Sequence, residues 1–331
     1  MKSVLGVDIG GTKIAVGPVS SGGEQLAPSL FALSRTNSLE AFVSGLEQVL
    51  REAVRQFQAY APAALGVACA GTVDHDRGVV VTSPNLPLQD FPLAQVLEEK
   101  LGLPVFLEND ANAALVGEAA AGAAVGMRHV VMLTLGTGVG GALFLEGKLY
   151  RGTSGAAGEL GHMTVVRGGL TCRCGARGCL EMYASGPALV RYAAAYMRDS
   201  ERDPGGELLG LYEQGKLTGG AVARLAREGH RGAVEAVEQL GTWLGVGLMN
   251  ITNIFEPQMI VVGGGVGELG EMLLRPARAY LRQYALPPGR DQVQVVAAKL
   301  GNGAGLVGGA LVAWEGLESS ACHDGVIPPA R

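Results

Sequence analysis

The sequence predicts an α/β protein built from two domains. Its 331 residues exceed the roughly 250–300 residues at which a single hydrophobic core stops growing. Short apolar runs alternate with segments in which apolar residues recur every three or four positions, as expected for strands alternating with helices. Each half also opens with a strand, a glycine-rich turn and a second strand, at 4–16 and 130–145. The two halves therefore indicate a duplication of the fold.

The first half is predicted to hold four strands and three helices. Residues 39–57 form an amphipathic helix, because Phe42, Leu46 and Leu50 recur at helical spacing. Pro92 suits the first turn of the next helix. The expected strands are 4–7, 14–16, 65–69 and 105–107, and the expected helices are 39–57, 91–101 and 111–121.

The second half repeats the pattern around a glycine-rich loop at 151–180. We place residues 1–112 and the helix near 303–316 in a smaller N-terminal domain, and residues 113–302 in a larger C-terminal domain. Residues 317–331 turn polar and are expected to form a flexible tail. The expected strands are 130–135, 142–145, 259–262 and 293–297, and the expected helices are 187–198, 219–228, 231–255, 268–284 and 303–315.

Composition argues against several classes of protein. Hydrophobic residues make up 48% of the chain and charged residues 17%, so a packed core is expected and disorder is not. The net charge of −5 lacks the basic excess of a nucleic-acid-binding protein. No apolar run reaches the roughly 18 residues of a membrane span. Asp8 lies too early for a signal peptide, so we expect a cytoplasmic protein.

Two glycine-rich turns between strands are candidate phosphate-binding loops. Successive backbone N–H groups of such a turn form a concave site for phosphate oxygens. A threonine adds a hydroxyl donor, a lysine adds a cation, and an aspartate at the strand end suits Mg²⁺. Taken alone, either turn is as consistent with an ordinary hairpin. The residues concerned are Asp8, Gly10, Gly11, Thr12 and Lys13 in the first turn, and Gly136, Thr137 and Gly138 in the second.

Two other nucleotide-binding motifs are rejected. The nearest Gly-Lys pair is followed by Leu149, so it does not complete the P-loop pattern G-x-x-x-x-G-K-[ST]. Gly136, Gly138 and Gly141 match G-x-G-x-x-G, but the apolar run after them is expected to be a strand. A dinucleotide-binding fold needs a helix at that point.

Three cysteines and a histidine form a candidate zinc site. His162, Cys172, Cys174 and Cys179 have the spacing H-x9-C-x-C-x4-C in a glycine-rich loop. Four such ligands complete a tetrahedral structural Zn²⁺ site and leave no open position for chemistry. The alternatives are free thiols or a redox pair. Cys69, at the end of a strand, is expected to be a small buried hydrophobe.

A carboxylate follows a predicted strand at Glu108-Asn109-Asp110. Ligands of α/β sheets bind at the carboxyl ends of strands. Asp110 is therefore a candidate to accept a proton from a substrate hydroxyl. It is also a candidate N-cap of the helix that follows, and the two roles are compatible.

These motifs occur in an order that resembles the ROK family of repressors and sugar kinases, and within it the bacterial ATP-dependent glucokinases. The resemblance covers residues 4 to about 315 and depends on the joint pattern, which is far more specific than any single motif. The matching segments are 8–13, 108–114, 135–141, 159–162, 172–181 and 185–186.

The resemblance implies a fold, an activity and a set of site residues. The fold is an actin-like, ribonuclease-H-like pair of α/β domains with an interdomain cleft. The activity is transfer of phosphate from ATP to the 6-hydroxyl of glucose, with Asp110 as catalytic base and Mg²⁺ near Asp8. The implied sugar-binding residues are Asn85, Asn109, Asp110, Glu159, His162 and Glu181, and the adenosine is expected against Gly264 and Gly265.

The same resemblance gives His162 two roles, because the family's histidine binds zinc through one ring nitrogen and the sugar through the other. Loss of zinc is then expected to loosen sugar binding. The family also implies a homodimer or a homotetramer.

Several alternatives remain open at this point. The sugar is glucose or another hexose such as N-acetylmannosamine or N-acetylglucosamine; Glu181 favours an aldose, because fructokinases of the family tend to lack it. A sugar-sensing repressor would need a DNA-binding segment before the first glycine turn, where only a few residues precede Asp8. A polyphosphate donor would favour a basic groove, of which the net charge gives no sign.

Overall fold

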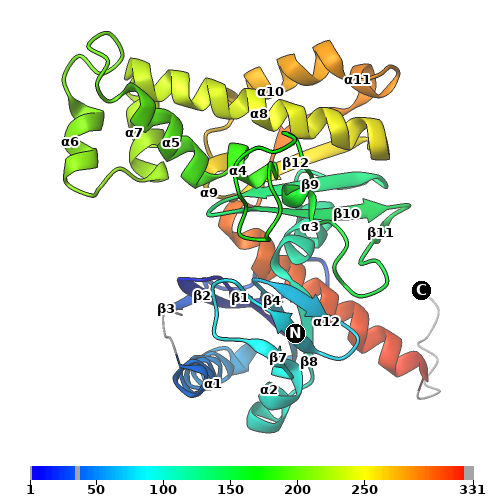
Figure 1. The fold of residues 1–331 in the computed structure, drawn as a ribbon. Coiled ribbons are helices and arrows are strands. Elements are labelled where there is room, and N and C mark those ends of the chain that lie inside the picture. The colour runs from blue at the N-terminus through cyan, green and yellow to red at the C-terminus, as the bar shows by residue number, and fades with distance from the viewer. Residues whose placement is uncertain (1, 34–37, 324–331) are drawn as a thin grey trace. The chain divides into compact units, whose positions relative to one another are not determined.

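The structure, a computed structural model, describes residues 2–33 and 38–323, with side chains described as far as residue 319. It divides into two compact units (Figure 1). Unit 1 comprises Met1–Gly126, Leu149–Ala157 and Asn302–Arg331, and unit 2 comprises Met127–Lys148 and Gly158–Gly301. The expected boundary at residue 112 falls within a helix of unit 1, which continues to Gly126 because this helix packs along the last helix of the chain.

Unit 1 contains a five-stranded sheet in the order β3-β2-β1-β4-β8. The first three strands of the chain form an antiparallel meander, and β4 and β8 add to it in parallel beside β1. The register places Asp8 opposite Ala15 on β2 and Ala68 on β4. The strands are β1 (Ser3–Ile9), β2 (Lys13–Val19), β3 (Leu30–Leu33), β4 (Pro62–Cys69) and β8 (Val105–Asn109).

Four α-helices accompany this sheet. Helices α1 and α2 bury apolar side chains in the same core as β1, β4 and β8. Helix α12, from the end of the chain, packs on α3 and on the sheet. The helices are α1 (Leu39–Gln56), α2 (Leu93–Leu101), α3 (Asp110–Ala121) and α12 (Ala304–His323), with short 3₁₀ turns η1 (Gln58–Tyr60) and η3 (Gly301–Gly303).

Glycines in β1 and β4 explain how closely α12 approaches the sheet. Side chains alternate between the two faces of a strand, and every second residue of β1 from Leu5 to Ile9 is buried in the core with α1 and α2. A Cβ at Gly6 would lie 2.1 Å from the backbone oxygen of Leu306, and one at Gly66 would lie 1.9 Å from a backbone oxygen of the same helix. Any larger residue at either position would push the helix away.

A second, antiparallel sheet of unit 1 was not predicted. Its strands are very short and carry polar residues, so they lack the apolar alternation of a longer strand. They are β5 (Thr72–Asp74), β6 (Val79–Thr82) and β7 (Gln89–Phe91), in the order β5-β6-β7.

Unit 2 repeats the five-stranded sheet of unit 1. Its order is β11-β10-β9-β12-β13, with β10 antiparallel to β9 and with β12 and β13 parallel. Position by position this is the strand order of unit 1, which confirms the predicted duplication. The strands are β9 (Val130–Leu135), β10 (Val139–Leu145), β11 (Lys148–Leu149), β12 (Met259–Gly263) and β13 (Gln294–Ala297).

One hydrophobic core joins this sheet to the helices of unit 2. The central helix α8 packs against α10, α5 and α7. Helices α4, α6, α9 and α11 are short, and none of the four was predicted. The helices are α4 (Glu181–Ala184), α5 (Gly186–Tyr196), α6 (Glu207–Glu213), α7 (Gly219–Arg227), α8 (Arg231–Phe255), α9 (Gly264–Gly267), α10 (Glu271–Tyr284) and α11 (Gly289–Gln292), with the 3₁₀ turn η2 (Leu160–His162).

The end of the chain corrects one expectation. A flexible tail was expected from residue 317, but α12 continues to His323. The rest of the predicted tail, 324–331, lies outside the described residues. In the part of the chain that the structure describes, no helix is both long and apolar enough to cross a membrane.

Candidate active site

The first glycine turn joins β1 to β2 and is closed by its own backbone. The N–H of Gly10 donates to the backbone oxygen of Lys13 at 3.0 Å. A Cβ at Gly11 would lie 2.8 Å from the Cβ of Asn85, so the turn packs against this residue, an expected sugar ligand. The Lys13 ammonium lies 3.7 Å from the centre of the Phe31 ring.

Asp8, beside this turn, is close enough to Asp110 for the two carboxylates to interact electrostatically. Burial, and then the negative charge of Asp110, raise the pKa of Asp8 to about 7, while Lys13 acts in the opposite direction. A Cβ at Gly305 in α12 would lie 3.0 Å from the Asp8 carboxyl group, so this glycine leaves room for it. Two carboxylates that repel each other in this way favour a bound cation between or beside them. Mg²⁺ prefers carboxylate oxygen as a ligand.

Asp110 is fixed at the junction of β8 and α3. The Asn109 side chain, and not Asp110, is the N-cap: its oxygen accepts from the N–H groups of Ala111 at 2.9 Å and Asn112 at 3.0 Å. Asp110 is the first residue of α3, and its Oδ1 accepts from the Ala111 N–H and from the Asn109 amide, at 2.9 and 3.0 Å. The Asn109 amide also donates to the backbone oxygen of Gly71, at 2.9 Å. The strand end is therefore rigid.

A buried ion pair next to Asp110 was missed by sequence reasoning. Glu108 is 2% exposed and its Oε2 accepts from Arg151 Nε at 2.6 Å. Its Oε1 accepts from the Asn109 N–H and the Asn112 amide, at 3.0 and 2.9 Å. His75 Nδ1 lies 3.6 Å from the same carboxylate. No local pattern predicts a pair whose members are 43 residues apart.

The second glycine turn joins β9 to β10 in unit 2. Gly136 donates its N–H to the Gly138 oxygen at 2.9 Å and accepts at its own oxygen from Gly186, at 2.8 Å. Glu181 Oε2 accepts from the Val139 N–H at 3.0 Å, and a Cβ at Gly138 would lie 2.4 Å from that oxygen. Glu181, expected at the sugar, thus supports this turn. The strand β10 follows it directly, which confirms that the G-x-G-x-x-G match is not a dinucleotide motif.

The expected zinc ligands come together within unit 2. The ligand atoms of His162, Cys172, Cys174 and Cys179 all lie within 4.8 Å of one another. The Cys174 and Cys179 sulfurs are 3.7 Å apart, and the Cys172 sulfur is 3.7 Å from His162 Nδ1. Two thiolates bound tetrahedrally to one Zn²⁺ at about 2.3 Å lie about 3.8 Å apart, so the donor set and its spacing fit zinc.

The loop around these ligands depends on one glycine with a left-handed backbone. Gly178 has φ +85°, and a Cβ there would lie 1.7 Å from the Val166 backbone oxygen. His162 Nε2, the nitrogen that does not face the cysteines, lies 3.9 Å from Glu159 Oε2. Cys69, outside the cluster, is fully buried at the end of β4, as expected, and burial raises the pKa of its thiol.

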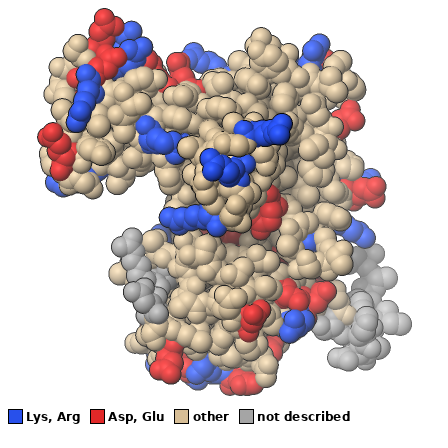
Figure 2. Space-filling model, in the orientation of Figure 1, with Lys and Arg blue, Asp and Glu red and all other residues tan. Residues whose placement is uncertain are grey.

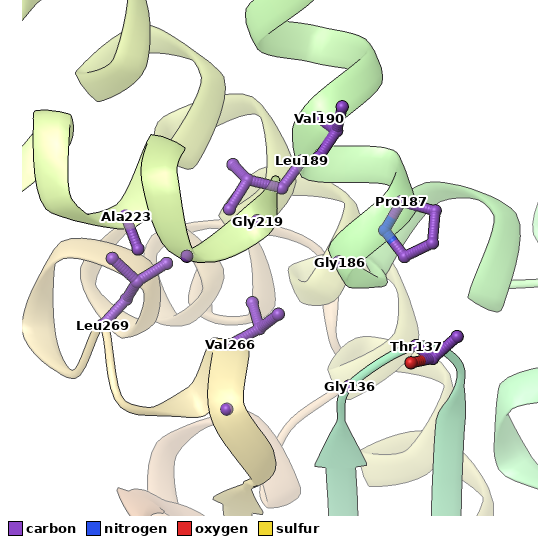
Figure 3. Close-up of a pocket in the computed structure, with 12 residues that line it drawn as sticks. Gly136, Thr137, Gly186, Pro187, Leu189, Val190, Gly219, Ala223, Val266 and Leu269 are labelled. Atoms are coloured by element: carbon purple, nitrogen blue, oxygen red, sulfur yellow. The ribbon is translucent and has the colours of Figure 1, made fainter. Parts of the chain in front are cut away.

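A pocket of about 390 Å³ lies above the second glycine turn (Figure 3). Gly136 and Thr137 of the turn line it, as does the expected adenosine contact Gly265. Gly264 does not line it: this residue has φ +79°, and a Cβ there would lie 2.4 Å from the Leu135 oxygen. The other lining residues are Gly186, Pro187, Leu189, Val190, Gly219, Gly220, Ala223, Val266 and Leu269.

Sequence reasoning missed most of this pocket. Figure 3 shows Leu189 on α5, Ala223 on α7, and Val266 and Leu269 on one segment around the space, with Thr137 at the strand turn. The sequence predicts helices at 187–198 and 219–228, but nothing in it indicates that their apolar residues line a pocket. The glycine pair that opens α7 was the one local signal of a close approach.

The six expected sugar-binding residues divide between the two units. Asn85, Asn109 and Asp110 belong to unit 1, where Asn109 and Asp110 are bonded to each other and Asn85 flanks the glycine turn. The other three belong to unit 2, where Glu159 lies near His162 and Glu181 lies beside the second turn: Glu159, His162 and Glu181.

Comparison with known proteins shows that the chain is similar to bacterial glucokinases and hexokinases. The glucokinase of Streptomyces coelicolor is 40% identical over 319 residues, which cover 95% of this chain and 98% of that protein. The ROK family glucokinase of Streptomyces griseus, solved in complex with glucose and AMPPNP, is 39% identical and superposes with a TM-score of 0.82 over 93% of this chain and 98% of that chain. The ROK hexokinase of Thermus thermophilus is 35% identical, with a TM-score of 0.75 over 96% and 99% of the two chains.

The family model agrees with the individual relatives. The ROK family model matches residues 4–315, nearly the full length of the chain. The predicted actin-like sugar kinase fold is confirmed by these neighbours and by the repeated sheet. The chain belongs to the ROK family.

Proposed function

We propose that this chain transfers the γ-phosphoryl group of ATP to the 6-hydroxyl of glucose. The observation that carries the proposal is the Asp8 and Asp110 pair beside the first glycine turn, where one carboxylate suits a cation and the other a substrate hydroxyl. The relatives that are 34–40% identical are glucokinases matched over nearly their whole length, and a glucokinase of 39% identity was solved with glucose and AMPPNP. Both sets of observations favour a hexose kinase.

Asp110 is the residue that we assign as the proton acceptor. The Ala111 N–H and the Asn109 amide hold its Oδ1, so the carboxylate keeps one orientation at the start of α3. It takes the proton of the sugar 6-hydroxyl as that oxygen attacks the γ-phosphorus, and ADP leaves. A positioned general base of this kind contributes about 10²–10⁴ in rate.

The two glycine turns and Asp8 are the groups proposed to stabilise the negative charge of the phosphates. Backbone N–H groups of Gly11 and Thr12 and of Thr137 and Gly138 are the proposed donors to phosphate oxygens, with the hydroxyls of Thr12 and Thr137, because the N–H groups of Gly10 and Gly136 already close their own turns. Mg²⁺, when bound, neutralises phosphate charge, and Asp8 is the residue that would hold it. A bound cation would also return the raised pKa of Asp8 toward its usual range.

The apolar pocket of unit 2 is the proposed adenosine site. Its walls are aliphatic and glycine, which suits the flat face of a base, and Thr137 connects it to the phosphate turn. The cysteine and histidine cluster is the proposed Zn²⁺ site, with a structural role because four protein ligands fill the tetrahedron. His162 Nδ1 would bind the metal and Nε2 would face the sugar.

A panel of sugars with one variant tests the proposal. ADP release from Mg-ATP is measured with glucose, mannose, fructose, N-acetylglucosamine and N-acetylmannosamine. We expect the highest kcat/KM on glucose and a loss of about 10²–10⁴ in kcat for Asp110→Asn. The matched control is Asp74→Asn, another aspartate of unit 1, whose carboxylate contacts the exposed Arg77.

Each outcome has a definite meaning. If Asp110→Asn keeps turnover within tenfold of the parent, Asp110 is not the base. Preference for an N-acetyl sugar keeps the mechanism and changes the substrate. No turnover on any sugar, with zinc and Mg²⁺ present, contradicts the enzyme and favours a sugar sensor.

A further inference from the structure

A second pocket of unit 2 is not used by the proposed reaction. It has a volume of about 640 Å³, within the range of small-molecule sites, and lies between the zinc loop, α5 and α8. It shares no lining residue with the pocket above the second glycine turn. Its walls include two arginines and three aromatic residues, and none of the described residues that line it is acidic. The residues used below are Arg177, Arg191, Tyr183 and Trp243.

The charge around this pocket has one sign. Residues 163–180, which form the zinc loop, contain three arginines and no Asp or Glu, in a chain whose net charge is −5. Figure 2 shows basic side chains grouped over the region where Figure 1 draws α4 and α5. Neither Arg177 nor Arg191 forms an ion pair with a carboxylate among the residues that the structure describes.

The acidic residues nearest in sequence to the α8 wall are engaged elsewhere. Gln239 lines the pocket, while its neighbour Glu238 pairs with Arg275 at 3.3 Å. Glu235, one turn earlier, pairs with Arg202 at 2.6 Å. The two arginines of the pocket therefore keep their charge available for an anion.

The walls of the pocket are already fixed. Arg177 Nε donates to the Gly169 oxygen at 3.1 Å, and Arg191 donates to the Met182 oxygen. The Leu170 N–H donates to the Tyr183 hydroxyl at 2.9 Å. A guanidinium has five N–H donors, so these contacts orient each arginine without using all of its donors.

An aromatic surface lies between the same elements. The rings of Tyr183 and Trp243 are 4.7 Å apart between centroids and tilted by 37°. Tyr183 is almost fully buried and Trp243 is half-buried, so Trp243 presents part of its ring to the pocket. An indole face packs against a sugar ring or a base, and paired guanidinium groups recognise phosphate oxygens.

We propose that this pocket binds a phosphomonoester whose organic part is a ring, with the phosphate at Arg177 and Arg191 and the ring against Trp243. A sugar phosphate and a nucleoside monophosphate share this chemistry. The site lies outside the proposed phosphoryl-transfer machinery. Consecutive residues of α5 line the two pockets: Val190 lines the proposed adenosine pocket and Arg191 lines this one. We therefore expect a ligand bound here to change the affinity for the nucleotide through α5.

Tryptophan fluorescence tests the proposal without any catalytic assay. The chain has two tryptophans, and Trp314 lies in unit 1 with its Nε1 donating to the Val19 oxygen at 3.3 Å. In a Trp314→Phe background, Trp243 is the only reporter. Glucose 6-phosphate, AMP, inorganic phosphate and glucose are titrated separately.

We expect saturable quenching by glucose 6-phosphate or AMP, with the tighter of the two identifying the natural class. Arg177→Ala and Arg191→Ala should each weaken that binding by at least tenfold. Arg198→Ala is the matched control, because Arg198 is exposed just beyond α5 and does not line the pocket. Circular dichroism and zinc content establish that each variant is folded.

Three results would overturn the proposal. The first is absence of quenching by both esters at 10 mM, roughly the weakest affinity that a metabolite site can use. The second is equal loss of binding in Arg198→Ala. The third is inorganic phosphate binding as tightly as the esters, since the ring would then contribute nothing.

Discussion

Replacing Arg151 by alanine should be among the most destabilising single changes on this protein's surface. Arg151 is the charged partner of Glu108, which is 2% exposed, and their atoms are 2.6 Å apart. Removing one member of a buried pair costs about 3–5 kcal/mol, because the other charge is left without compensation. Glu108 Oε1 keeps two hydrogen bonds, from Asn109 and Asn112, so the lower end, about 3 kcal/mol, applies.

Urea unfolding followed by circular dichroism measures this loss. At an m-value of about 3 kcal/mol/M, a loss of about 3 kcal/mol moves the midpoint of the transition that reports unit 1 by about 1 M. The matched control is Arg55→Ala. Arg55 also binds a carboxylate, that of Glu52, at 2.8 Å, but the side chains are 74% and 59% exposed, so no measurable change is expected.

A double variant separates the effect of an unpaired Glu108 charge from the effect of losing the Arg151 side chain. Glu108→Gln with Arg151→Ala removes both charges of the pair, and the glutamine oxygen still accepts from Asn112. It should therefore recover most of the stability lost in Arg151→Ala alone. If Arg151→Ala behaves like Arg55→Ala, or if the double variant is as unstable as the single one, the reasoning from burial is refuted.

Three further predictions concern the metal, the pH and the nucleotide turn. Removing zinc, by chelation or by Cys172→Ser, should raise the KM for glucose by about 10–100-fold, and an unchanged KM would separate zinc from the sugar site. Without Mg²⁺, the folded state keeps a proton on Asp8 up to its pKa of about 7, so the free energy of unfolding should fall as pH rises from about 4 to 7. Asp8→Asn should remove that slope, and a slope that persists in pH-dependent urea unfolding would argue for another group. Gly264→Ala should lower Tm by about 5 °C, because the new Cβ would clash with the Leu135 oxygen. Gly265→Ala has open space around its Cβ, so it should leave Tm unchanged and raise the KM for ATP. Equal Tm values for the two variants would contradict this reasoning.

The sequence was most informative where chemistry and local pattern coincide. The central strands of the two five-stranded sheets carry apolar runs, and the proposed zinc ligands lie close together in the sequence, so the strands and the clustering of these four side chains could be predicted from residues alone. The cap of α3 shows the limit: Asn109 and Asp110 are both good capping residues, and only the backbone φ and ψ decide that Asn109 is the N-cap.

Features made by distant segments could not be predicted. The Glu108 and Arg151 pair joins β8 to a segment that follows β9, β10 and β11, and no sequence pattern near either residue indicates its partner. The strands β5, β6 and β7 have three or four residues each, too few to show alternation. The adenosine pocket is likewise assembled from four segments whose apolar residues serve as ordinary core positions elsewhere.

The place of α12 in unit 1 has a consequence for how the chain is made. A ribosome releases the strands of the first sheet early, but the helix that covers Gly6 and Gly66 is among the last segments to emerge. Unit 2, which ends before α12 begins, can close its own core first. At about 5–20 residues per second, the N-terminal sheet waits roughly 10–40 s with one face uncovered. During that interval, a chaperone that binds exposed apolar surface would protect this protein most.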